Sequence, residues 1–239
     1  MKGGPRAHGV SGARALGVPA RIMACAAAAV VALAALPANA QGTKPKPASA
    51  APAAAPAAAA VPYRQRFAEV CAACHGANGR NDAMPGTPAL SGQHSFYAIT
   101  QLFLFREGRR ENPAMTAVAK GMKDADMQGF ADFIATLPPV PPTAPATPND
   151  AARMTKGQAL AQEHKCVFCH GADLSGGQQV PRIAQQREDY LQTTLREFKS
   201  GKRPGYTMAM SAAVSQISVE DLDTLAYYIA RFPAGTPGK

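Results

Sequence analysis

Two short cysteine–histidine motifs carry the chemistry that this sequence suggests. They are Cys71-Ala72-Ala73-Cys74-His75 and Cys166-Val167-Phe168-Cys169-His170. Two thiols one helical turn apart can each add to a vinyl group of one haem, and the adjoining histidine then supplies an imidazole nitrogen as the fifth ligand of the iron. The spacing therefore predicts two covalently bound c-type haems. The predicted attachment points are Cys71, Cys74, Cys166 and Cys169, and the predicted iron ligands are His75 and His170.

Two other uses of paired cysteines fit this sequence less well. A zinc site would need its second C-x-x-C pair after a short loop, whereas the two pairs here lie 95 residues apart. A thioredoxin-like redox pair would lie in a βαβ pattern, which the sequence lacks. Because the whole motif occurs twice, we interpret both copies as haem attachment sites.

The charge of the chain gives no sign of a nucleic-acid partner. The sequence has 239 residues and a net charge of +9, but residues 1–40 contribute four basic and no acidic residues. The remainder carries 21 basic and 16 acidic residues, a net charge of +5. The carboxylates of two haems would lower this to about +1. Such a balance argues against a basic nucleic-acid footprint and gives no clear steering signal for a redox partner.

The first 62 residues predict export followed by a tether. Residues 1–40 have the pattern of a signal peptide: a basic region ending at Arg21, an apolar run over residues 22–36, and Ala38-Asn39-Ala40 as the cleavage site. The run is about 15 residues long, which is short for a transmembrane helix, although an uncleaved signal could hold the protein at the membrane. Residues 41–62 are rich in alanine and proline and predict a disordered tether. We therefore expect a periplasmic protein.

The rest of the chain divides into two similar halves. We expect a first haem domain at residues 63–137, a proline-rich linker at 138–148, a second haem domain at 149–233 and a tail at 234–239. Each half ends in an amphipathic helix with apolar residues at i, i+3, i+7 and i+10, and strand patterns are absent. The predicted fold is therefore all-α, with two tandem cytochrome c-like domains related by internal duplication. Because each half is small, we expect it to fold poorly without its haem.

The duplication also identifies a candidate for the sixth ligand of each iron. His75 and Met115 lie 40 residues apart, and so do His170 and Met210. A thioether at this position closes the iron for electron transfer, whereas an open position binds small molecules. We therefore predict Met115 and Met210 as axial ligands. Met208 competes with Met210, which the register of the downstream helix favours. His94 and His164 each occur in one half only and are predicted to lie at the surface.

Further positions follow from the alignment of the two halves. Pro88 and Pro181 align, and a carbonyl oxygen there could accept the imidazole N–H of the histidine ligand. Arg110 and Arg203 also align. These two arginines either pair with haem propionates or are solvated surface charges, and the sequence leaves both interpretations open.

These repeated features resemble the dihaem cytochrome c4 family over residues 63–233. Each C-x-x-C-H-G motif is followed by P-x-[LI]-x-x-Q, a Tyr-led helix, G-x-R, a methionine and an acidic-capped amphipathic helix. The P-x-[LI]-x-x-Q elements are residues 88–93 and 181–186, and Gln185 replaces the glycine of the family's G-Q pair. The resemblance implies two class I cytochrome c domains that face each other about a pseudo-two-fold axis.

The resemblance also implies a function. It indicates a periplasmic electron carrier, not an enzyme, that takes electrons from a quinol-oxidising complex or a dehydrogenase and passes them towards a terminal oxidase. One alternative is a cytochrome subunit of a dehydrogenase or oxidase complex, which would use the same haem chemistry. Another is a dihaem peroxidase or thiosulfate-oxidising enzyme. Such an enzyme needs an open or cysteine-ligated iron, and the remaining cysteine, Cys25, lies in the predicted signal.

Overall fold

The computed structural model describes residues 57–144, 148–203 and 208–233. Within these ranges the backbone is helical, without strands, and its only bridge joins Gly177 to Val180. The predicted signal at 1–40, the tail at 234–239 and most of the predicted tether lie outside the described residues. No described helix is long and apolar enough to cross a lipid bilayer.

The first half contains the helices α1 (Ala57–Val70), α2 (Ala72–His75), α3 (Ser95–Arg106), α4 (Pro113–Ala119) and α5 (Asp124–Thr136). Helix α5 is the amphipathic last helix that the sequence pattern predicts for the first half. Helix α1 begins inside the stretch 41–62 that composition predicts as tether, because alanine is the strongest helix former and residues 57–60 are all alanine.

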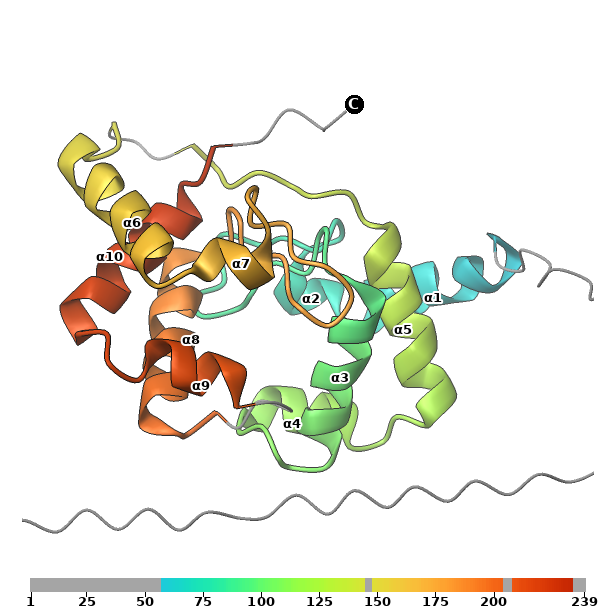
Figure 1. Cartoon of the computed structure of the whole chain (residues 1–239). Coiled ribbons are helices and arrows are strands. Elements are labelled where there is room, and N and C mark those ends of the chain that lie inside the picture. The colour runs from blue at the N-terminus through green and yellow to red at the C-terminus, as the bar shows by residue number, and fades with distance from the viewer. Residues whose placement is uncertain (1–56, 145–147, 204–207, 234–239) are drawn as a thin grey trace, which may run out of the picture. The chain divides into compact units, whose positions relative to one another are not determined.

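The second half repeats this order with α6 (Ala151–Glu163), α7 (Cys166–His170), α8 (Glu188–Ser200), α9 (Ala209–Val214) and α10 (Val219–Ala230). The Ser218 hydroxyl caps α10 by accepting a hydrogen bond from the backbone N–H of Asp221 at 3.0 Å. The predicted all-α fold with a tandem duplication is confirmed. In Figure 1, helices α1–α5 group together and α6–α10 form a second group.

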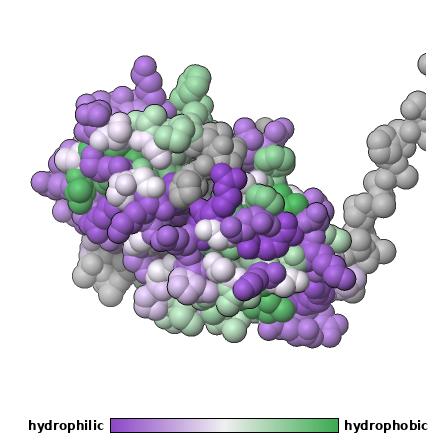
Figure 2. Space-filling view, turned by 90° about the horizontal axis from the view of Figure 1, so that it is seen from below, coloured by the Kyte–Doolittle hydropathy of each residue, from purple (hydrophilic) through white to green (hydrophobic). Residues whose placement is uncertain are grey.

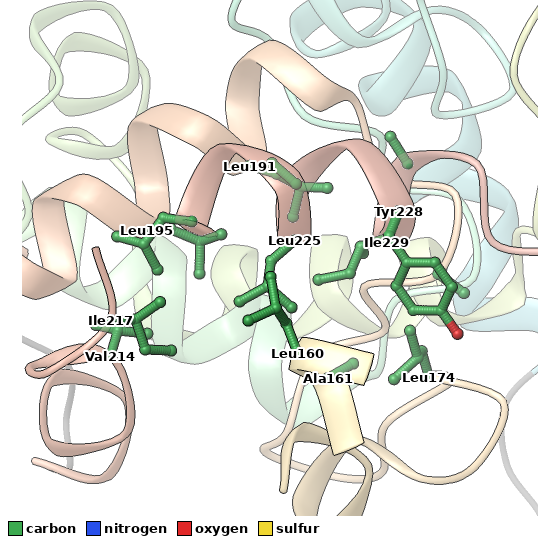
Figure 3. Packing of buried hydrophobic residues seen from close by; sticks show 14 residues of the cluster. Leu160, Ala161, Leu174, Leu191, Leu195, Val214, Ile217, Leu225, Tyr228 and Ile229 are labelled. Atoms are coloured by element: carbon green, nitrogen blue, oxygen red, sulfur yellow. The ribbon is translucent and has the colours of Figure 1, made fainter. Parts of the chain in front are cut away.

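Each half has its own hydrophobic core, built around its last helix. In the first half, Met127, Phe130 and Ile134 of α5 are at most 4% exposed and pack with Phe67 of α1. In the second half, Leu222, Leu225 and Ile229 of α10 are at most 3% exposed. Figure 3 shows side chains of α8 and α6 converging on Leu225. The predicted apolar faces of both helices therefore point inward.

A glycine lets the first and last helices of each half approach closely. A Cβ atom on Gly129 of α5 would lie 2.1 Å from the ring of Tyr63 on α1. In the second half the roles are exchanged, because a Cβ atom on Gly157 of α6 would lie 2.3 Å from Cβ of Tyr228 on α10. In both halves a tyrosine thus lies over a glycine, but the glycine is on the last helix in the first half and on the first helix in the second half.

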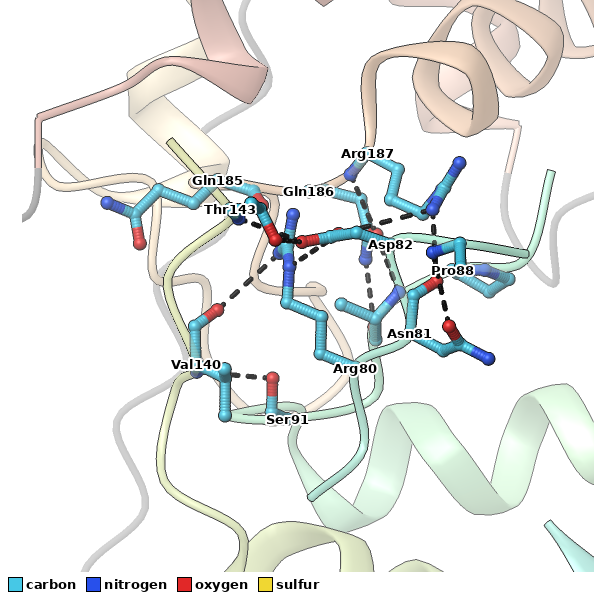
Figure 4. Close-up of polar contacts among 12 residues, drawn as sticks. Arg80, Asn81, Asp82, Pro88, Ser91, Val140, Thr143, Gln185, Gln186 and Arg187 are labelled. Atoms are coloured by element: carbon cyan, nitrogen blue, oxygen red, sulfur yellow. Dashed lines mark hydrogen bonds and ion pairs between the residues drawn. The ribbon is translucent and has the colours of Figure 1, made fainter. Parts of the chain in front are cut away.

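The two halves contact each other through the loops that follow α2 and α7 (Figure 4). The guanidinium of Arg80 donates to the backbone oxygen of Gln185 at 2.7 Å, and Arg187 donates to the backbone oxygen of Asn81 at 3.0 Å. Asp189 accepts a hydrogen bond from the backbone N–H of Gly86 at 2.8 Å. These bonds connect segments that are about 100 residues apart in the chain, so the two halves form one continuous structure.

The proline-rich linker runs along the first half before it enters the second. The backbone N–H of Val140 donates to the Ser91 hydroxyl at 3.2 Å, and that of Thr143 donates to the Asp82 carboxylate at 2.8 Å. Arg80 also forms an ion pair with Asp82 at 2.8 Å. Asp82 therefore binds both the linker and Arg80, the residue that also contacts the second half.

The face of the protein in Figure 2 is mostly hydrophilic, with hydrophobic residues in several separate patches. Among the large hydrophobic side chains of the described residues, Phe168, between the motif cysteines of α7, is the most exposed, at 88%. Its counterpart in the first half is the much smaller Ala73. The two motif helices thus present different surfaces to solvent.

Candidate haem sites

One cavity of about 600 Å³ contains both candidate sites. Side chains of both halves line it, and apolar residues such as Leu102, Phe130, Leu195 and Ile229 form much of its wall. The lining includes every predicted site residue: Cys71, Cys74, His75, Arg110, Met115, Cys166, Cys169, His170, Arg203 and Met210. The structure therefore brings together residues that are up to 139 positions apart in the sequence.

The attachment motifs form the short helices α2 and α7, each of which ends at its histidine. Glycine follows both histidines, with φ/ψ of 77°/153° at Gly76 and 81°/160° at Gly171. This region of backbone conformation is open essentially only to glycine. The chain therefore turns away directly after each histidine and leaves the imidazole in the cavity wall, where His75 is 6% and His170 is 5% exposed.

The four thiols of the motifs are free and lie at the edge of the cavity. In each motif the first cysteine is half-buried and the second is exposed. Burial raises the pKa of the Cys71 thiol to about 11 and also raises the pKa of Cys166. Redox-active cysteine pairs have lowered thiol pKa values, so this environment disfavours a thioredoxin-like use of the motifs.

Both histidine rings are held by a proline carbonyl, as the alignment predicts. Nδ1 of His75 lies 2.9 Å from the backbone oxygen of Pro88, and Nδ1 of His170 lies 3.0 Å from that of Pro181. A carbonyl oxygen only accepts, so Nδ1 carries the proton and Nε2 keeps its lone pair. Burial lowers the pKa of both imidazoles, which favours the neutral form. A neutral imidazole with a free Nε2 is the donor that a haem iron requires.

The two predicted methionines line the cavity from equivalent short helices. Met115 in α4 and Met210 in α9 are both half-buried and line the cavity, and they pack against the cores of their respective halves. Met208 precedes α9, is 76% exposed and does not line the cavity. The placement thus favours Met210 over Met208 as the candidate ligand.

Sequence reasoning missed the helices that carry these methionines. Helix α4 begins at an N-cap, where the Asn112 side chain accepts a hydrogen bond from the backbone N–H of Met115 at 2.9 Å. Pro113 occupies the first helical position, where its missing N–H costs nothing. The pair Asn112-Pro113 was therefore a readable signal for a helix start. No such side-chain cap begins α9.

The two predicted arginines meet between the halves. Arg110 donates to the Gln101 side chain at 2.7 Å, and Arg203 donates to Thr194 at 2.9 Å. Both guanidinium groups also contact the hydroxyl of Tyr190. Arg203 is only 5% exposed, so its interpretation as a solvated surface charge is wrong. Arg110 is half-buried.

Among the described residues, cations line the cavity and carboxylates do not. Its charged lining residues within the described ranges are Arg110, Lys165, Arg182 and Arg203. Burial would raise the pKa of the Tyr190 phenol, but the charges of Arg110 and Arg203 outweigh burial and lower it. The pKa of the neighbouring Tyr97 is raised, chiefly by burial. This polar part of an otherwise apolar cavity is suited to carboxylate groups such as those of haem.

His94 and His164 do not lie freely at the surface, so that prediction was wrong. Nε2 of His94 lies 2.9 Å from the backbone oxygen of Ser175, which places His94 between the two halves. His164 is half-buried and lines the cavity beside α7. The sequence showed only that each of these histidines lacks a counterpart in the other half. It could not show where they lie, because their surroundings include parts of the chain that are distant in sequence.

The residues present fit haem. The cavity has an apolar wall, paired thiols at its edge, a histidine with a free Nε2 in each half and cations for carboxylates. In the described ranges, no group of three or more histidine, cysteine or acidic side chains could hold a metal ion directly. Two helical domains with these features define a dihaem c-type cytochrome.

Comparison with known proteins agrees with this class and makes it more specific. The Cytochrome c family model matches the chain twice, at residues 63–138 and 154–232. A cytochrome c4 from Thiocapsa roseopersicina is 32% identical over 171 residues, which cover 67% of this chain and 85% of that protein. The crystal structure of reduced recombinant cytochrome c4 from Pseudomonas stutzeri has a TM-score of 0.63 and 25% sequence identity, covering 73% of this chain and 98% of that one. The chain belongs to the cytochrome c4 family.

A further relative has a more specific description. A thiosulfate dehydrogenase electron acceptor from Thiomonas intermedia is 30% identical over 176 residues, which cover 71% of this chain and 80% of that protein. Together with the family match, this likeness supports an electron-transfer cytochrome with two covalently bound c-type haems.

Proposed function

We propose that this cytochrome is a periplasmic electron shuttle whose two haem irons are held by His75 with Met115 and by His170 with Met210. One observation carries the proposal: in each half, a histidine with a free Nε2 and a methionine line the same cavity. Closed coordination by both side chains suits a carrier without substrate chemistry of its own. Bound haem would supply the one-electron redox chemistry.

The protein's own residues would set the properties of each site. The proline carbonyls orient the imidazoles, and the neutral thioether of each methionine favours ferrous iron and so raises the potential. The apolar wall limits the access of water. Because the two pockets differ, for example in Arg182 where the first half has Ala89, we expect two different potentials.

The donor and acceptor belong to the same proposal. The relative described as a thiosulfate dehydrogenase electron acceptor supports a dehydrogenase as the electron donor. A quinol-oxidising complex is the other candidate donor, and a terminal oxidase is the candidate acceptor. The pattern of residues 1–40 supports export, with peripheral membrane association if the signal is retained. A permanent cytochrome subunit would differ by co-purifying with its enzyme.

A redox titration of the purified holoprotein with carbon monoxide added to the reduced form tests the closed coordination. We expect two haems per chain, both with the weak methionine–iron band near about 700 nm and neither binding the gas. Replacing Met115 or Met210 by alanine should remove one half of the band and open one haem to carbon monoxide. The matched variant Met208→Ala should change neither the band nor the binding of carbon monoxide. A native haem that lacks the band and binds the gas would support the peroxidase-type alternative.

A further inference from the structure

The glutamine that ends each P-x-[LI]-x-x-Q motif reaches across to the other half. Gln186 accepts a hydrogen bond from the backbone N–H of Ala89 at 2.7 Å through Oε1, and its Nε2 donates to the backbone oxygen of Ala89 at 2.9 Å. Gln93 donates through Nε2 to the backbone oxygen of Arg182 at 2.7 Å. Both glutamines are 6% exposed. Each therefore contacts the residue that follows the histidine-binding proline of the opposite half.

In the first half, Gln186 and His75 bind opposite ends of the same peptide group, the one between Pro88 and Ala89. The carbonyl of Pro88 accepts the Nδ1–H of His75, and the N–H of that peptide bond belongs to Ala89, which donates to Gln186. The backbone N–H of Arg187 donates to the same Oε1 at 3.0 Å, which fixes the amide of Gln186 (Figure 4). A peptide group that donates at one end becomes a better acceptor at the other, because hydrogen bonds in a chain polarise one another.

The second half lacks this arrangement. Gln93 reaches only the backbone oxygen of Arg182, and its own Oε1 is buried without a hydrogen-bond partner in the described part of the chain. The peptide group between Pro181 and Arg182 is therefore not held at its N–H by Gln93. The two histidines thus bind similar carbonyls, but only the carbonyl that holds His75 is polarised by the motif glutamine of the other half.

We propose that Gln186 is a positioning residue for His75, through which the second half tunes the potential of the first haem site. Polarising the Pro88 carbonyl strengthens its hydrogen bond to Nδ1–H, and a stronger bond makes the imidazole a better donor to iron. A better donor stabilises ferric iron and lowers the potential. The inference rests on the proposed function, because it takes His75 to be an iron ligand.

The variant Gln186→Met tests the inference, because it keeps the length of the side chain and removes both hydrogen bonds to Ala89. In the holoprotein, with the haems assigned by NMR, we expect the potential of the His75 site to rise and that of the His170 site to move less. The Nδ1–H of His75 should exchange faster with solvent in the reduced protein. The mirror variant Gln93→Met should leave the His75 site unchanged and have the smaller effect overall.

A second control separates tuning from loosening of the contact. His94→Ala removes a different bond between the halves, from Nε2 to the Ser175 oxygen, and should not reproduce the selective shift. Equal shifts at both haems in Gln186→Met, or no shift at the His75 site, would overturn the inference. If the unmodified protein lacked the methionine–iron band, the proposed function would fail instead, so the two failures are distinguishable.

Discussion

Arg110 of the first half donates a hydrogen bond to the hydroxyl of Tyr190 in the second half at 3.0 Å. Arg203 lies 3.2 and 3.3 Å from the same hydroxyl through its two terminal nitrogens, and 3.4 Å from the hydroxyl of Tyr97. Each arginine therefore reaches the tyrosine of the other half. The arrangement is not symmetric, however, because both guanidinium groups converge on Tyr190.

This convergence predicts that Tyr190→Phe destabilises the protein more than Tyr97→Phe. Removing the Tyr190 hydroxyl takes a shared acceptor from two guanidinium groups, one of them almost fully buried, and should cost about 1–3 kcal/mol. Removing the Tyr97 hydroxyl takes away the longer contact with Arg203 and the contact with Tyr190, but leaves Tyr190 as the acceptor for both guanidinium groups. Urea unfolding of the two holoprotein variants compares the costs. Equal losses would mean that haem carboxylates, and not Tyr190, satisfy the arginines.

The contact between the halves should weaken in acid through Asp189. Its carboxylate is held by Arg187 and accepts the Gly86 N–H from the other half, and these contacts lower its pKa to about 2. Because the folded-state pKa lies below the unfolded value, the contribution to stability is present above about pH 4. It is lost as the pH falls towards 2.

The Asp189 carboxylate is 43% exposed, so solvent screening limits its contribution to about 1 kcal/mol or less. Unfolding by urea between pH 2 and pH 5 measures it: the native protein should lose more stability over this range than Asp189→Asn. Parallel pH profiles would assign the acid sensitivity to other carboxylates.

Sequence spacing was sufficient to find the cysteines, histidines and methionines that line the cavity as candidate haem-binding residues. The 40-residue interval predicted both Met115 and Met210, because duplicated domains keep the same path between motif and ligand. The aligned prolines predicted the carbonyls that hold His75 and His170. These relations are local to one half, so comparing the halves within a single sequence reveals them.

Contacts between the halves could not be predicted in this way. The alignment marked Gln93 and Gln186 as equivalent, but it could not show that each crosses to the other half or that only Gln186 makes two bonds. It likewise aligned Tyr97 with Tyr190, whose environments differ because Arg110 reaches across. Side-chain partners at such a contact depend on the docking of two domains, which leaves no periodicity in the sequence.

Loss of its haem should unfold the half that binds it. Without a cofactor, the apolar wall of the cavity of about 600 Å³ would be exposed to water, and burial of this wall is part of what stabilises each half. Replacing both cysteines of one motif by serine prevents attachment there. We expect circular dichroism to show loss of helix in that half. Full native helicity in the variant would show that the helices pack without the cofactor.

The glycines after the two histidines should differ in their tolerance of alanine. Both have a positive φ that strains any other residue, so each substitution should cost more than about 1 kcal/mol. At Gly76 the added Cβ would also lie 2.2 Å from the backbone oxygen of Arg80, whereas at Gly171 the nearest atom is a side-chain oxygen of Asp173 at 3.1 Å. A flexible side chain can move and a backbone carbonyl cannot. Thermal unfolding of Gly76→Ala and Gly171→Ala should therefore show the larger loss at Gly76. If Gly171→Ala lost as much stability, backbone strain alone would set the cost at both sites.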